Sequence, residues 1–174
     1  MKKYLEDKDY DALNEYLNNY QKSIPDEHIF FCENSAVNAI LSYFSEQART
    51  FGITYSVSTL IPKHISISET DLSILFGNLL ENAIDACNAQ PGEDKKIIVR
   101  AKTDDHSLCV TIDNTFSGSL DINQEGHFVS SKHEGLGLGT ESIKSIAEKY
   151  GGVCQFEANN GMFYASVMCF KDHA

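Results

Sequence analysis

Two asparagines and an aspartate recur at helical spacing within the stretch LFGNLLENAIDACNAQ, residues 75–90. At about 100° per residue, Asn78, Asn82 and Asp85 fall within one narrow sector of a helix, and the apolar residues fill the opposite half. A solvent-facing edge is the simplest interpretation. However, Asn is a poor helix former, and an unpaired amide at the border of a core costs about 1–3 kcal/mol. Amide oxygens suit a Mg²⁺ ion that also holds phosphate, so this polar stripe is a candidate site.

Two further segments contain residues that could bind a ligand. The predicted strand CVTID ends in Asp113, whose carboxylate can accept a hydrogen bond from an exocyclic amine such as that of adenine. An ordinary Asx turn explains the same residue. The segment GLGLG, residues 135–139, directly precedes a predicted helix, where backbone amides and the helix dipole form a phosphate site. A flexible loop is the alternative. The segment fits neither the dinucleotide-binding G-x-G-x-x-G motif nor the P-loop.

The elements that position these candidates are several helices and strands. Apolar periodicity predicts a helix over Val37–Phe51 and another that begins after Ser68, with Asp71 completing a capping box. The second helix carries one broad apolar face: Leu72, Leu75, Phe76, Leu79, Leu80, Ala83, Ile84 and Cys87. Alternation predicts the strands ITYSVS, IIVRAK, LCVTID, VCQFEA and MFYASVMCF, the last two joined by a turn at residues 159–161. This order predicts an α+β, two-layer sandwich with helices on one face of a mixed, mainly antiparallel sheet, preceded by short N-terminal helices.

Composition limits the classes of partner. The net charge of −11 argues against nucleic acid and against an anionic membrane surface, because Lys and Arg carry such binding. Five well-separated cysteines without a C-x-x-C pair are typical of reduced thiols. No apolar stretch approaches membrane-spanning length. We therefore expect a soluble, cytoplasmic chain.

In this order, the asparagine helix, the strand-end acid and the glycine loop resemble the GHKL ATPase superfamily. NLLENAIDA is similar to its N box, IDNTFSG to its first glycine box and GLGLG to its second. The segments SIKSIAEKYGG and GMFYASV are most similar to the histidine-kinase branch, and within it to the peptide-sensing (quorum-sensing type) kinases of Gram-positive bacteria. The resemblance implies a Bergerat-type ATP-binding catalytic domain over residues 34–174. It also implies that residues 1–33 are the remnant of a dimerisation helical segment and its linker.

The resemblance also implies a role for each matching residue in binding Mg²⁺-ATP. Asn82 would coordinate Mg²⁺, with Asn78 as a second candidate ligand and Asp85 on a metal-bound water. Asp113 would accept a hydrogen bond from the adenine amine. Residues 121–134 would form a lid in which Lys132 could reach the phosphates, an ordinary solvated lysine being equally consistent with the sequence. The glycine boxes would add Thr115, Gly118, Gly135, Leu136, Gly137, Leu138 and Gly139.

The chain also departs from the family pattern. Asn78 stands where ATP-hydrolysing members carry Glu, and an amide cannot take a proton, so we expect weak hydrolysis and phosphate donation to a positioned acceptor. Thr115 replaces the first glycine of the first glycine box. The family's acceptor histidine lies in an R-H-D-like motif, and no histidine here has that context: His28, His64, His106, His127, His133 and His173.

These features predict the ATP-binding catalytic domain of a two-component sensor histidine kinase. It would donate the γ-phosphate to a histidine outside this chain. The full protein would be a membrane-bound receptor with a cytoplasmic kinase part, dimeric through its N-terminal helices, acting on a response regulator. One alternative is an anti-sigma-type serine kinase, against which the helix over Val37–Phe51 argues. Another is a nucleotide-silent dimerisation or docking module, which the degenerate first glycine box supports.

Overall fold

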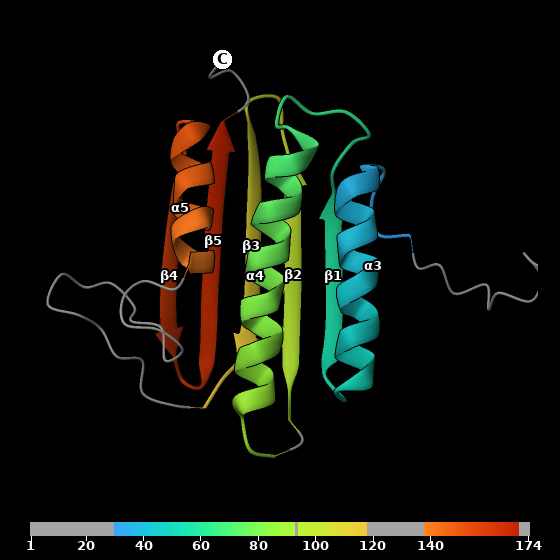
Figure 1. Ribbon diagram of the computed structural model, residues 1–174, viewed down its shortest axis with the longest axis vertical. Coiled ribbons are helices and arrows are strands. Elements are labelled where there is room, and N and C mark those ends of the chain that lie inside the picture. Colours follow the sequence, from blue (N-terminus) through green and yellow to red (C-terminus); the bar gives the residue numbers. More distant parts are fainter. Residues whose placement is uncertain (1–29, 93, 118–137, 171–174) are drawn as a thin grey trace, which may run out of the picture.

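The computed structural model describes residues 30–92, 94–117 and 138–170, in which three helices cover one face of a five-stranded sheet (Figure 1). The helices are α3 (Ser35–Thr50), α4 (Glu69–Ala89) and α5 (Leu138–Lys149). The strands are β1 (Thr54–Leu60), β2 (Lys96–Thr103), β3 (Ser107–Thr115), β4 (Val153–Asn159) and β5 (Met162–Phe170). The sheet order is β1-β2-β3-β5-β4, with β1 and β2 parallel and the other neighbours antiparallel. The predicted α+β sandwich is confirmed. The predicted N-terminal helices, and with them most of the proposed segment 1–33, lie outside the described residues.

Local signals in the sequence set where the elements begin and turn. Asn34 caps α3 by accepting a hydrogen bond from the Val37 amide at 3.1 Å. Ser68 caps α4 by accepting from the Asp71 amide at 3.1 Å, as the capping box predicts. The hairpin between β4 and β5 turns at Asn160 and Gly161, whose φ values of 51° and 74° lie in the left-handed region.

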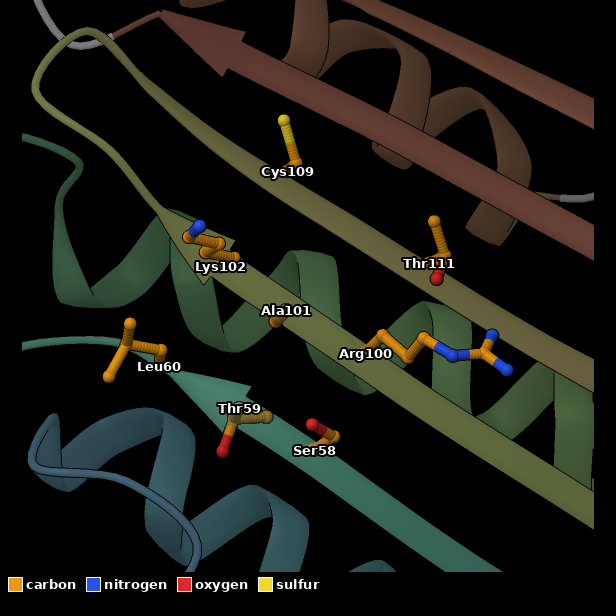
Figure 2. Close-up of a pocket in the computed structure, with 8 residues that line it drawn as sticks. All are labelled: Ser58, Thr59, Leu60, Arg100, Ala101, Lys102, Cys109 and Thr111. Atoms are coloured by element: carbon orange, nitrogen blue, oxygen red, sulfur yellow. The ribbon is translucent and has the colours of Figure 1, made fainter.

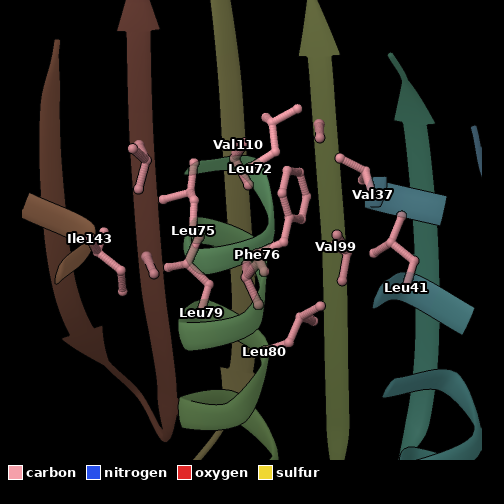
Figure 3. Packing of buried hydrophobic residues seen from close by; sticks show 14 of the residues in the cluster. Val37, Leu41, Leu72, Leu75, Phe76, Leu79, Leu80, Val99, Val110 and Ile143 are labelled. Carbon is pink, nitrogen blue, oxygen red and sulfur yellow. The ribbon is translucent and has the colours of Figure 1, made fainter. Parts of the chain in front are cut away.

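The core lies between the helices and the sheet (Figure 3). All eight apolar residues predicted for the inner face of α4 are buried. They pack against alternate residues of the central strands, including Val99 of β2 and Val110 of β3. This burial fixes which face of each strand points toward the helices, because side chains alternate along a strand.

The C-terminal end of α5 is packed directly onto β5. The Gly152 amide donates to the Ala147 carbonyl at 2.8 Å, and the Phe170 amide donates to the Tyr150 carbonyl at 2.9 Å. A Cβ atom on Gly152 would lie 1.8 Å from the Met168 carbonyl oxygen. Only glycine therefore allows the chain to pass this close to the strand.

A polar cluster joins this end of α5 to the start of α4. Oδ2 of the buried Asp71 accepts hydrogen bonds from Ser68 Oγ at 2.6 Å, Tyr150 OH at 2.6 Å and Lys149 Nζ at 2.7 Å. The Lys149 ammonium, followed by the two hydroxyl donors, lowers the pKa of Asp71 to about 2. The carboxylate is therefore charged at neutral pH, and three donors converge on its Oδ2 atom.

Replacing Gly152 with alanine should destabilise the fold by about 3 kcal/mol or more, because a backbone carbonyl occupies the space of the new methyl group. Gly77→Ala is the matched control. Gly77 lies within α4 with nothing within 4 Å of its Cβ position, so alanine should stabilise the helix by up to about 1 kcal/mol. Urea denaturation measures both. Equal stability of the two variants would contradict the close approach.

Asp71→Asn should lower the free energy of unfolding at pH 7 by about 1–3 kcal/mol, because three donors lose a charged acceptor. The folded-state pKa lies below the unfolded value, so the carboxylate stabilises the fold above the unfolded pKa. The deficit of the variant should therefore shrink as the pH falls from about 3.8 to about 2. Urea titrations across this range measure it, with the exposed first-turn acid Glu69→Gln as control. A deficit independent of pH would contradict this assignment.

Candidate functional site

The structure brings together two of the candidate segments, the polar stripe of α4 and the end of the glycine loop. Asn78 is half-buried and Asn82 is exposed on α4. A Cβ atom on Gly139 would lie 3.2 Å from Asn78 Oδ1 and 3.6 Å from Asn82 Nδ2. The absence of a side chain at Gly139 therefore leaves room beside both amides.

This contact places a helix N-terminus against the polar stripe. The helices α4 and α5 lie side by side over the sheet and run in opposite directions (Figure 1). The first turn of α5 therefore lies beside the middle of α4, where Asn78 and Asn82 are. The first amides of a helix have no intrahelical acceptor, and the helix dipole adds positive potential there. The junction combines amide oxygens that suit a cation with backbone amides that suit phosphate.

Asp113 does not lie with these residues. On β3 it falls between Ile112 and Asn114, and the buried Ile112 faces the helices. The side chain of Asp113 therefore points to the other face of the sheet. There its Oδ2 accepts from Arg100 Nη1 at 2.7 Å. Figure 2 shows this face, with Arg100 lying along β2 beside Thr111 and the helices behind the sheet.

Asn114 is the polar residue of β3 that faces the helices. The residue is 2% exposed, and its neighbours in register are Ile97 on β2 and Phe163 on β5. Its Nδ2 donates to the carbonyl of Thr115 at 3.0 Å, which fixes the orientation of the amide. Asn114 was not among the site residues predicted from the sequence, although the alternation of Val110, Ile112 and Asn114 along the strand was a signal for it.

Thr115 has a structural role in the fold. Its Oγ1 accepts from the Lys96 amide at 2.9 Å and so extends the pairing of β2 and β3 by one residue. The Sγ atom of Cys87 lies 3.6 Å from the same hydroxyl, at the end of α4. A hydroxyl at this position therefore ties the end of β3 to both neighbours, which glycine could not do.

The remaining predicted site residues differ in burial, and several of them lie outside the described residues. Asp85 is half-buried on α4, and Glu81 is exposed. Leu138 opens α5, but its side chain is not described. The lid over residues 121–134 and five predicted ligand residues lie outside the described residues: Gly118, Lys132, Gly135, Leu136 and Gly137. Within the described part of the chain, no helix is long and apolar enough to cross a membrane, and no three His, Cys, Asp or Glu residues cluster as metal ligands.

Comparison with known proteins identifies the family. The sequence model of the GHKL domain matches residues 67–169. The probable C4-dicarboxylate sensor kinase of Bacillus subtilis (strain 168) is 26% identical over 138 residues. The match covers 74% of this chain and 25% of that protein, so the chain spans a quarter of this relative's length.

Solved histidine kinases share the fold. The nucleotide-free catalytic domain of histidine kinase ThkA superposes with a TM-score of 0.62 at 21% identity, covering 78% of this chain and 90% of that one. Histidine kinase AdeS of Acinetobacter baumannii gives 0.59 at 12% identity, covering 79% and 64%. ThkA in complex with the response regulator protein TrrA gives 0.57 at 19% identity, covering 79% and 40%.

The chain belongs to the GHKL domain family, and its fold is that of the catalytic domains of histidine kinases. The predicted resemblance is thereby confirmed in family and fold. Its placement among the peptide-sensing kinases of Gram-positive bacteria stays a prediction, as do the individual site residues.

Proposed function

We propose that this chain binds Mg²⁺-ATP between α4 and α5 and is the catalytic domain of a sensor histidine kinase. The observation that carries the proposal is the position of Gly139 at the N-terminus of α5, where an added Cβ atom would touch both Asn78 and Asn82. The GHKL family match and the kinase names of the relatives support the same assignment.

The phosphates would lie at the start of α5. Its first backbone amides have no acceptor within the helix, and phosphate is the ligand that such a terminus favours. Gly139 matters here because any side chain would enter the space between the helix terminus and the two asparagines. The predicted glycines Gly135 and Gly137 would extend this cradle on the preceding loop.

Asn82 would hold Mg²⁺, with Asn78 as a second ligand and Asp85 acting through a metal-bound water. The donor set fits the ion, because Mg²⁺ is held by one or two oxygen ligands together with phosphate and its own waters. When bound, the ion neutralises charge on the phosphate oxygens. Asn78 cannot accept a proton, so the residues of this chain position the phosphates and leave water unactivated.

We assign Asn114, in place of Asp113, as the residue that contacts the base. Asp113 is held by Arg100 on the far face of the sheet, whereas Asn114 faces the helix layer in which the other site residues lie. Nδ2 of Asn114 donates to the Thr115 carbonyl, so Oδ1 is the atom of this side chain that can accept a hydrogen bond from the base. An acceptor at this place suits the exocyclic amine of adenine.

The acceptor of the phosphoryl group would be a histidine outside this chain, and the next partner a response regulator. The complex of ThkA with TrrA is a precedent for such a partner. The complete protein would be a homodimer with a cytoplasmic kinase part.

Asn114→Ala should weaken the binding of Mg²⁺-ADP by roughly tenfold, because a hydrogen bond to the base, worth about 1–1.5 kcal/mol, is lost. Asp113→Ala is the matched control one residue away, and its affinity should stay within about twofold of the unmodified chain. Isothermal titration calorimetry measures both variants. A large loss for Asp113→Ala with none for Asn114→Ala would restore the original assignment.

Asn82→Ala should remove the dependence of ADP affinity on Mg²⁺, because the protein ligand of the ion is gone.

Gly139→Ala should weaken nucleotide binding with or without the ion, because its methyl group meets Asn78 Oδ1 at 3.2 Å. The control Gly77→Ala should bind like the unmodified chain. If the unmodified chain fails to bind millimolar Mg²⁺-ADP, the nucleotide-silent module becomes the better account.

A further inference from the structure

The polar cluster around Asp71 lies at the opposite end of α5 from Gly139. Oδ2 of Asp71 accepts from one side chain beside the start of α4 and from two at the end of α5, Lys149 and Tyr150. The Tyr150 hydroxyl also accepts from the Ser68 amide at 3.0 Å. These four residues take no part in the proposed nucleotide contacts, yet they connect the two helices that form the site.

We propose that Asp71 is a positioning residue for the nucleotide site, holding α5 at the angle at which Gly139 meets Asn78 and Asn82. This inference rests on the proposed function. It assigns to the cluster a role in ligand affinity beyond its contribution to stability.

The geometry of a helix explains how the effect reaches the site. The twelve residues of α5 span about 18 Å at a rise of 1.5 Å per residue. A rotation of about 3° at one end therefore moves the other end by about 1 Å. A shift of this size would change the space that the missing side chain of Gly139 leaves beside Asn78 and Asn82. Displacements of about 1 Å in a site can be costly for function.

Besides the burial of Ile146 and Ala147 in the core, two sets of contacts hold the C-terminal end of α5. The Gly152 approach and the Phe170 hydrogen bond attach it to β5. Neither contact involves α4, so neither by itself sets the distance between the two helices. The Asp71 cluster joins the two helices directly, because its acceptor lies in the first turn of α4 and two of its donors lie at the end of α5.

The test compares Asp71→Asn and Tyr150→Phe with a control that destabilises the fold elsewhere. Val57→Ala serves, because Val57 is half-buried against the core on β1, at the opposite edge of the sheet from β4. Urea denaturation first establishes that all three variants are folded at the temperature used. Calorimetry with Mg²⁺-ADP should then show binding weakened roughly fivefold or more in both cluster variants. Val57→Ala should stay within about twofold of the unmodified chain. Unchanged affinity in the cluster variants would overturn the proposal.

A nucleotide-free readout separates this inference from the proposed function. In ¹⁵N NMR spectra of the unliganded chain, the side-chain amide signals of Asn78 and Asn82 report on the contact with Gly139. Asp71→Asn and Tyr150→Phe should shift these signals, and Val57→Ala should leave them in place. If the unmodified chain binds no nucleotide, the proposed function fails, and the amide signals still decide whether Asp71 sets the position of α5. Signals that do not move would overturn the positioning role.

Discussion

The helix α4 packs its apolar face against the sheet and, at the same time, the polar border of that face beside α5. The arrangement of the site follows from this double packing. The apolar face of α4 is buried against the sheet, and the border of that face carries Asn78, Asn82 and Asp85. A helix packed beside that border must leave the polar groups accessible. The start of α5 does so because Gly139 brings backbone and no side chain to the two asparagines. The same packing that completes the core thus creates a junction of amide oxygens and backbone amides.

The elements and the inner face of α4 were predictable from the sequence because their signals are local. Apolar periodicity over α4 leaves one choice of buried face, and Ser68 with Asp71 marks the helix start. The residue that we propose to contact the base was harder to predict, because Asp113 and Asn114 are consecutive polar residues at the end of a strand. A difference of one residue exchanges the two faces of the sheet. Burial of Val110 and Ile112 decides in favour of Asn114, and the ion pair with Arg100 explains where Asp113 goes.

The role of Asp71 could not be derived from spacing. The sequence shows a capping residue, and the Ser68 partner is three positions away. Two other donors, Lys149 and Tyr150, are 78 and 79 positions away, and only the packing of α5 on α4 brings them to the same oxygen. Likewise, Thr115 departs from the glycine-box pattern, and the structure gives the reason, because its hydroxyl accepts a hydrogen bond from the Lys96 amide. Both residues show that a departure from a motif can have a structural cause.

The most direct test of the nucleotide site is a crystal structure of the chain with Mg²⁺ and a non-hydrolysable ATP analogue. The proposed site requires phosphates at the N-terminus of α5, Mg²⁺ on Asn82 and the base beside Asn114. A nucleotide bound against Arg100 and Asp113 on the open face of the sheet would contradict it, as would crystals grown at saturating nucleotide that contain none.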